Sequence, residues 1–193
     1  MISSDNSGTG LYFLIGFMGS GKSMLSQGVQ RILGGISVEM DEEIEKVAGM
    51  SINDIFSTQG EDHFRKIERQ VLHDLIDQFR EVDDLVLIST GGGAPCFFDN
   101  MEVMKNAGTT IFINPSIDRL VMRLENRNEE RPLIRGKSRY EIKQYIGLQL
   151  EKRLPFYRQA HLHVNPLYED KELNIQFLKE VIQASGFQPI EDL

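Results

Sequence analysis

Short apolar runs alternate with segments of helical periodicity along most of the chain. The first apolar run covers residues 12–15, and apolar side chains over residues 24–33 then recur on one helix face. A longer amphipathic helix is predicted at residues 61–79, and further buried strands at residues 85–88 and 110–113. Strands that alternate with helices are typical of a parallel sheet covered on both faces. The pattern therefore predicts a three-layer α/β fold in a single domain.

Capping residues mark several further elements. A second strand is expected to end near Met40, and the acidic helix after it is followed by Ser51, which can cap another helix. Ser138 and Glu141 form a capping box for a helix that Pro155 is expected to stop or kink. The pattern is completed by a fifth strand at residues 162–164 and a last helix at residues 173–182.

The segment over about residues 125–138 differs from the rest of the chain. It is polar, and Pro132 and Gly136 make a continuous helix through it unfavourable. Every fourth residue across and beside it is an arginine, at positions 123, 127, 131, 135 and 139. Because the protein as a whole is acidic, this local concentration of arginine predicts a lid that closes on phosphate.

The composition is that of a soluble globular protein. The 193 residues are 40% hydrophobic and 26% charged, and the net charge of -8 argues against a nucleic-acid-binding surface. No apolar run has the length of a membrane span, and residues 1–10, expected to be a flexible tail, lack the features of a signal peptide. A cytoplasmic protein is therefore expected. The single cysteine, Cys96, predicts an incidental thiol.

The most specific motif is Gly16-x-x-x-x-Gly21-Lys22-Ser23, between a predicted strand and a predicted helix. Backbone N–H groups at the helix start can face nucleotide phosphates, Lys22 adds a positive charge, and the Ser23 hydroxyl can bind magnesium. An ordinary glycine turn would need neither the lysine nor the serine. We therefore predict that this phosphate loop binds ATP or GTP with Mg²⁺. The expected nucleotide contacts come from Gly19, Ser20, Gly21, Lys22, Ser23 and Met24.

A second group of residues follows two other strands. Glu39 and Asp41 come at the end of the second strand, where an extended segment would place both on one face at the ligand-binding edge of the sheet. Either acid could instead belong to the solvated start of the acidic helix, where Asp41 would make a good cap. Gly91, Gly92 and Gly93, called the glycine turn below, follow a later strand and allow a ligand to approach the backbone closely. These residues predict a site for a second substrate.

Six motifs in order carry a resemblance to a known family. GFMGSGKS, DEEIEKVAGMSINDIF, GEDHFRKIE, STGGGAP, RNEERPLI and KRLPFYRQAH, over about residues 11–164, resemble shikimate kinase, a family in the nucleoside-monophosphate-kinase-like branch of P-loop proteins. The resemblance implies a five-stranded parallel sheet of order 2-3-1-4-5, a substrate-binding segment at about residues 41–80 and a lid. It also implies transfer of the ATP γ-phosphoryl group to the 3-hydroxyl of shikimate, giving shikimate 3-phosphate and ADP.

The resemblance also implies roles for residues in the transfer itself. Lys22 and Ser23 would serve ATP and magnesium, and Asp41 would hydrogen-bond the acceptor hydroxyls of shikimate. Arg131 would swing in with the lid to reach the transferring phosphate, and Arg127 would lie beside the adenine. Lys22, Asp41 and Arg131 are thus the expected catalytic residues.

Further residues are implied for the acceptor and the metal. Arg65 and Arg153 would clamp the shikimate carboxylate, and Gly91, Gly92 and Gly93 would lie against the substrate. Glu39 stands where the family has an aspartate that helps to hold magnesium through water, so an altered metal site is expected.

Two alternatives compete with this interpretation. A gluconate or nucleoside monophosphate kinase would share the phosphate loop and the lid arginines, but it would not need the combination of Asp41, Arg65, the glycine turn and Arg153. A catalytically silent relative that acts as a binding module would be expected to have lost Lys22, Asp41 or the lid arginines. The sequence keeps all of them. The expected ligands are ATP and shikimate, and the expected oligomeric state is a monomer.

Overall fold

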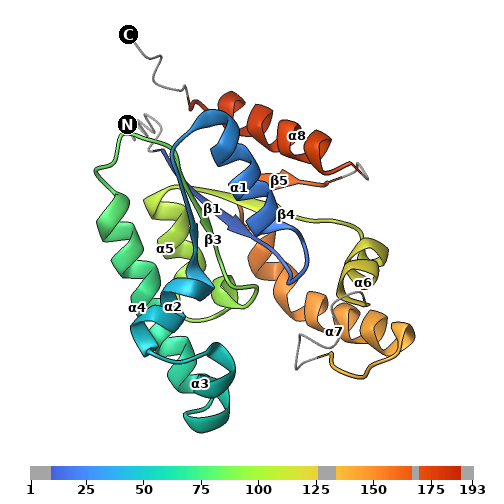
Figure 1. Ribbon diagram of the computed structural model, residues 1–193. Coiled ribbons are helices and arrows are strands. Elements are labelled where there is room, and N and C mark those ends of the chain that lie inside the picture. Colours follow the sequence, from blue (N-terminus) through green and yellow to red (C-terminus); the bar gives the residue numbers. More distant parts are fainter. Residues whose placement is uncertain (1–9, 126–133, 167–169, 188–193) are drawn as a thin grey trace.

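Five parallel strands form one sheet at the centre of the computed structural model, which describes residues 10–125, 134–166 and 170–187 (Figure 1). The strands are β1 (Leu11–Ile15), β2 (Ile36–Glu39), β3 (Val86–Ser89), β4 (Thr109–Ile113) and β5 (Leu162–Val164). Their order across the sheet is β2-β3-β1-β4-β5, and every pairing between neighbours is parallel. The predicted α/β fold and its strand order are confirmed.

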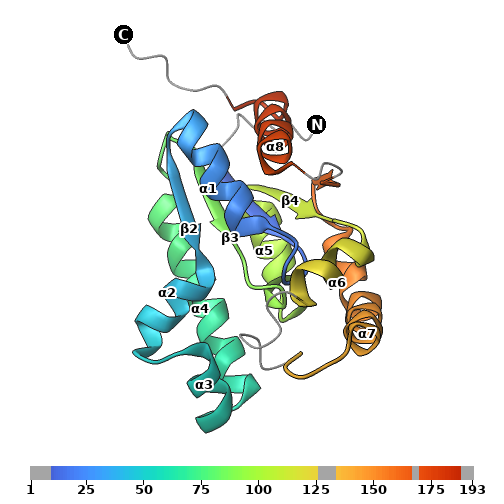
Figure 2. The ribbon, with the colours of Figure 1, turned by 45° about the vertical axis from the view of Figure 1, so that its right-hand side comes forward.

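Helices cover both faces of the sheet (Figures 1 and 2). One face packs against α1 (Lys22–Leu33) and α8 (Lys171–Ala184). The other face packs against α4 (Glu61–Phe79), α5 (Asn100–Ala107), α7 (Arg139–Tyr157) and neighbouring elements. The remaining helices are α2 (Met40–Ala48), α3 (Ile52–Thr58), α6 (Ile117–Glu125) and the short 3₁₀ helix η1 (Ala94–Cys96). Among the helices of the described ranges, none combines the length and apolar character needed to cross a membrane.

Strand β1 shows why the sheet needs both layers of helices. Successive side chains of a strand point to opposite faces. Leu11, Phe13 and Ile15 accordingly belong to the hydrophobic cluster on the α4 side, whereas Tyr12 and Leu14 belong to the cluster on the α1 side. All five residues are buried, as expected for the central strand of a parallel sheet.

Most predicted element ends are confirmed. Ser51 caps α3 by accepting a hydrogen bond from the Asp54 N–H, and Ser138 forms the expected capping box with Glu141 at the start of α7. Pro155, however, does not stop α7, which continues to Tyr157. Pro155 removes one hydrogen bond within the helix, the one to the Glu151 carbonyl, but only two residues of α7 follow it.

Two elements after the glycine turn, η1 and α5, were not predicted. Helix α5 has only eight residues, which is too short for clear periodicity. Two predicted segments lie outside the described residues: the tail at residues 1–9, and residues 126–133 of the lid. Of the lid's remaining residues, Ile134 is buried against the hydrophobic cluster on the α4 side.

The parallel register brings the ends of β1, β2 and β3 to one edge of the sheet. Leu14 and Glu39, on the two strands that flank β3, both pair with Ser89. The phosphate loop, the start of α2 and the glycine turn follow these three strands, so they converge at this edge. This is the edge at which open α/β folds bind their ligands.

The prediction that Glu39 and Asp41 share one face of an extended segment is wrong. Strand β2 ends at Glu39, which is the N-cap of α2, and Asp41 lies in the first helical turn. The alternative holds in part: Asp41 is exposed at the start of the acidic helix, although the N-cap is Glu39 and not Asp41. Acidic side chains in the first turn interact favourably with the positive end of the helix dipole, so the helix can begin directly after the strand.

Candidate active site

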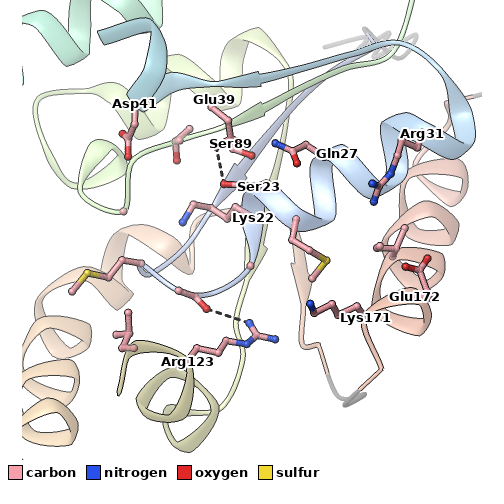
Figure 3. Close-up of a pocket in the computed structure, with 18 residues that line it drawn as sticks. Lys22, Ser23, Gln27, Arg31, Glu39, Asp41, Ser89, Arg123, Lys171 and Glu172 are labelled. Atoms are coloured by element: carbon pink, nitrogen blue, oxygen red, sulfur yellow. Dashed lines mark hydrogen bonds between the residues drawn. The ribbon is translucent and has the colours of Figure 1, made fainter. Parts of the chain in front are cut away.

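A pocket of about 820 Å³ opens at the carboxyl edge of the sheet (Figure 3). Its walls come from the phosphate loop and α1, from the ends of β2 and β3, and from α6 and α8. Lys22, Ser23, Glu39 and Asp41 all line it. The structure therefore brings predicted nucleotide and metal residues into one cavity with two of the predicted acceptor residues, Gly92 and Asp41, the latter from a helix. The other predicted acceptor residues, Arg65, Gly91, Gly93 and Arg153, are not among the residues that line it.

The phosphate loop wraps around the start of α1. Gly21 is the N-cap of α1 and has a φ of 102°. Its position provides no capping side chain that could accept a hydrogen bond from the first N–H groups of the helix. A positive φ is readily adopted only by glycine, which explains this residue type at the turn into the helix. The Lys22 ammonium donates to the backbone carbonyls of Gly16 at 2.9 Å and Phe17 at 3.2 Å. The loop thus holds backbone donors and a cation next to the pocket, as anion binding requires.

Arg123 of α6 supports this loop, which the sequence analysis did not predict. Its Nη1 donates to the carbonyl of Ser20 at 2.9 Å and to that of Gly19 at 3.2 Å. The dashed line at Arg123 in Figure 3 marks the bond to Gly19. Burial, reinforced by the charge of Arg119, lowers the pKa of the Arg123 guanidinium. The only sequence signal for Arg123 was its place at the head of the arginine series. Two other members of that series, Arg127 and Arg131, lie outside the described residues, so their roles stay predictions.

Glu39 and Ser23 meet directly in the pocket. The Ser23 hydroxyl donates to Glu39 Oε2 at 2.7 Å. Burial raises the pKa of the Glu39 carboxyl, while the Ser23 hydroxyl and the charge of Lys22 act in the opposite direction. The second oxygen, Oε1, is buried and accepts no hydrogen bond from any described residue. A buried carboxylate oxygen of this kind is costly unless another group, such as a cation, compensates for its lost hydration.

A chain of hydroxyl groups fixes the surroundings of this pair. Ser26 donates to the Ser23 carbonyl at 3.1 Å and accepts from the Ser37 hydroxyl at 3.1 Å. Since a serine has one proton to donate, the 3.0 Å contact between Ser26 and Ser89 must use the Ser89 proton. This assignment leaves Oε1 of Glu39 without a hydroxyl donor, in agreement with its lack of a partner.

The donor set is suited to a hard divalent cation. Mg²⁺ prefers oxygen ligands and is usually held by one or two carboxylates together with substrate phosphates and water. Ser23 and Glu39 offer such oxygens beside the phosphate loop. No cluster of three or more acidic, histidine or cysteine side chains suited to a metal occurs in the described part of the chain. A cation here would therefore depend on the nucleotide for most of its other ligands.

Each glycine of the glycine turn lies against one of the predicted acceptor residues. A Cβ atom at Gly91 would be 2.9 Å from Asp41 Oδ1. At Gly92 it would be 3.4 Å from Arg153 Nη1, and at Gly93 it would be 2.7 Å from both terminal nitrogens of Arg65. Real Cβ atoms essentially never approach other atoms as closely as at Gly91 and Gly93. Gly91 and Gly93 therefore provide the space that Asp41 and Arg65 occupy, whereas Arg153 is at ordinary contact distance from Gly92.

Glu68 is a further buried residue of this cluster. It is 1% exposed, and its Oε2 accepts from Arg65 Nη1 at 2.7 Å. Burial raises the pKa of the Glu68 carboxyl, the Arg65 guanidinium opposes that shift, and the charge of Asp41 adds to it. The sequence analysis missed Glu68, although its position three residues after Arg65 on α4 was an available signal.

Arg65 is fixed in place by its neighbours. Its Nε and Nη2 donate to Glu61 Oε1 at 3.2 and 2.9 Å, and Nη1 donates to Glu68. The Phe97 ring covers one face of the guanidinium at 3.9 Å from its centroid. A guanidinium carries five N–H groups, so two remain beyond these three bonds, one on each terminal nitrogen. Arg65 can therefore offer a fixed pair of donors to a carboxylate.

Arg153 reaches the glycine turn from α7. Its guanidinium lies 5.3 Å from the centre of the Phe17 ring, which belongs to the phosphate loop. The contact with Gln149, at 3.5 Å, is at the limit of a hydrogen bond. Arg153 is therefore held less firmly than Arg65, and it is close to both the phosphate loop and the glycine turn.

Comparison with known proteins gives a consistent result. The family model described as shikimate kinase matches residues 18–184. A shikimate kinase of Parabacteroides distasonis is 43% identical over 150 residues, which is 78% of this chain and 84% of that protein. A shikimate kinase of Bacteroides fragilis is 39% identical over 174 residues, covering 88% of this chain and 94% of that protein.

Solved structures agree with the sequence comparisons. The 1.7 Å crystal structure of shikimate kinase from Bacteroides thetaiotaomicron has a TM-score of 0.81 and 39% identity, covering 89% of this chain and 97% of that one. The shikimate kinase from Acinetobacter baumannii in complex with shikimate has a TM-score of 0.79 and 27% identity, covering 92% of this chain and 94% of that one.

Replacing Glu39 with glutamine is expected to stabilise the metal-free protein at neutral pH. Burial raises the pKa of Glu39, so its protonated form favours folding. That contribution is complete below the ordinary glutamate pKa of about 4.3 and is lost as the pH rises through the raised value. Calorimetry should therefore find a higher Tm for Glu39→Gln than for the wild type. The difference in Tm should be smallest at about pH 4 and should grow toward pH 7.

The exposed Glu42, in the first turn of the same helix, provides a control with the same change of charge. Glu42→Gln should show much less of this pH-dependent gain in Tm. Equal Tm changes in both variants at every pH would contradict the account of Glu39.

Proposed function

Because the chain belongs to the shikimate kinase family, we propose that it transfers the γ-phosphoryl group of ATP to the 3-hydroxyl of shikimate. The products are shikimate 3-phosphate and ADP. The observation that carries the proposal is the meeting of the two halves of the site at Gly92. A Cβ atom there would lie 3.2 Å from the backbone nitrogen of Met18 in the phosphate loop and 3.4 Å from Arg153. The donor loop and the acceptor residues are thus in immediate contact.

The donor half binds the ATP phosphates. The N–H groups at the start of α1 and the Lys22 ammonium supply positive charge where the phosphates lie. Arg123 holds the Gly19 and Ser20 carbonyls, which keeps the loop in shape without using backbone donors. Arg127 and Arg131 are proposed to add contacts to adenine and to the transferring phosphate.

Ser23 and Glu39 are proposed to hold Mg²⁺ with the nucleotide. A bound magnesium ion neutralises charge on the phosphate oxygens during transfer. The Ser23 hydroxyl and the buried Oε1 of Glu39 are two protein oxygens that can serve this purpose. Glutamate is one methylene longer than aspartate, which lets its other oxygen contact Ser23 directly.

The acceptor half orients shikimate against the phosphates. Asp41 accepts a hydrogen bond from the attacking hydroxyl, positions it and can take up its proton. The two remaining N–H groups of Arg65 and the guanidinium of Arg153 bind the carboxylate. Glu68 and Glu61 keep Arg65 oriented. Phosphoryl transfer depends mainly on such alignment and on charge neutralisation.

The proposed reaction can be tested by product mass. The protein is incubated with Mg-ATP and, in separate samples, with shikimate, gluconate or nucleoside monophosphates. We expect one added phosphoryl group on shikimate alone, and its loss in Lys22→Ala, because that variant lacks the cation of the phosphate loop. Transfer to another acceptor in place of shikimate would contradict the proposed substrate, and unchanged transfer by the variant would contradict the role of Lys22.

The roles of Asp41 and Arg153 can be separated by steady-state kinetics. Asp41→Asn should lower kcat by about 10²- to 10⁴-fold, because the hydroxyl loses its proton acceptor. Arg153→Ala should mainly raise the KM for shikimate, by about 10- to 100-fold, as expected for a lost charged hydrogen bond of about 1.5–3 kcal/mol. If both variants raised only the KM and left kcat unchanged, Asp41 would have no role in the chemical step.

A further inference from the structure

Tyr157, the last residue of α7, joins that helix to the glycine turn. Its side chain is fully buried, and its hydroxyl donates a hydrogen bond to the Gly92 carbonyl. The ring packs on Phe112 of β4, with 5.0 Å between the ring centroids. Burial raises the pKa of the Tyr157 hydroxyl, so this group stays protonated and remains a donor at any pH near neutrality. The side chain thus combines a packing contact with one specific polar contact.

The hydrogen bond fixes the direction of a backbone N–H. The peptide between Gly92 and Gly93 is trans and planar, so its carbonyl oxygen and its N–H point in opposite directions. When the hydroxyl of Tyr157 holds the carbonyl, the Gly93 N–H must point away from Tyr157. No hydrogen bond joins this N–H to another residue in the described ranges. The Ala94 N–H donates to the Gly91 carbonyl at 3.1 Å and closes the turn, with Gly92 and Gly93 at its centre. Two central glycines allow the peptide between them to take more than one orientation, and the bond from Tyr157 selects one of these.

The same helix also supplies Arg153. Tyr157 follows Arg153 by four residues, which places both side chains on one face of α7. A Cβ atom added to Gly92 would lie 3.4 Å from Arg153 Nη1. The same Cβ atom would lie 3.2 Å from Met18 N and 3.4 Å from Gly16 O, both in the phosphate loop. The contact between Tyr157 and Gly92 therefore sets the relative positions of Arg153, the glycine turn and the phosphate loop.

We propose that Tyr157 is a positioning residue for the acceptor, whose hydroxyl keeps the Gly92–Gly93 peptide and Arg153 in one arrangement. The inference rests on the proposed function, in which these groups face shikimate. Loss of the hydroxyl leaves the Gly92 carbonyl without its donor, so only the hydrogen bonds of the turn itself then hold the Gly92–Gly93 peptide. Acceptor binding should then weaken, whereas the phosphate loop keeps its own hydrogen bonds to Lys22 and Arg123.

Tyr157→Phe tests the hydroxyl alone, because the ring and its contact with Phe112 are retained. Tyr12→Phe is the matched control. Tyr12 is similarly buried, at 2% exposure, and its hydroxyl is 3.0 Å from Ser185 Oγ. It lies near the amino end of β1, whereas the site lies at the carboxyl ends of the strands. Both variants lose one buried hydroxyl, so each should lower the Tm by about 2–4 °C.

Kinetics should distinguish the two variants. Tyr157→Phe is expected to raise the KM and the calorimetric Kd for shikimate about threefold to tenfold, with the KM for ATP changed less than about twofold. Tyr12→Phe should leave all three constants unchanged. Unchanged shikimate constants in Tyr157→Phe, or equal increases in both variants, would overturn this inference while the proposed function stands. Absence of shikimate phosphorylation by the wild type would overturn both.

Discussion

The close approach of the glycine turn to charged side chains is the constraint on which the rest of the site depends. The parallel register places this turn beside the phosphate loop, and two of its glycines leave room for a charged group. Gly91 accommodates Asp41 and Gly93 accommodates Arg65, whereas Gly92 lies closest to the phosphate loop, with Arg153 at ordinary contact distance. Three elements that are distant in the chain, α2, α4 and α7, can therefore deliver their side chains to one place. A side chain at the turn would separate the acceptor residues from the donor loop.

The gathering of charges has an energetic cost that the fold must offset. Glu39 and Glu68 are both removed from water, and burial raises the pKa of each carboxyl. Glu68 Oε2 is compensated by its ion pair with Arg65, whereas Oε1 of Glu68 and Oε1 of Glu39 accept no hydrogen bond from any described residue. Preorganised charge of this kind is common in active sites, because it stabilises the transition state without rearrangement during the reaction. The extensive apolar contacts on both faces of the sheet supply the compensating stability.

The sequence predicted those parts of the molecule that depend on local chemistry. Periodicity and the phosphate-loop motif identified β1, α1 and the site around Lys22, and the capping box identified the start of α7. The start of α2 was misplaced because a strand can pass into a helix without any intervening turn residue. Arg123 and the hydroxyl of Tyr157 were missed as supporting residues because their partners, the carbonyls of Gly19, Ser20 and Gly92, are backbone atoms that tertiary folding alone brings near.

The central claim is that the absence of side chains at the glycine turn lets the acceptor residues gather beside the phosphate loop. Calorimetric titration of Gly93→Ala with shikimate and with ATP tests it most directly. The added Cβ would lie 2.7 Å from Arg65 nitrogens that Glu61, Glu68 and Phe97 hold in place. The account predicts at least about a tenfold weaker Kd for shikimate, the loss of roughly one charged contact, with ATP binding retained. An unchanged Kd for shikimate would contradict it.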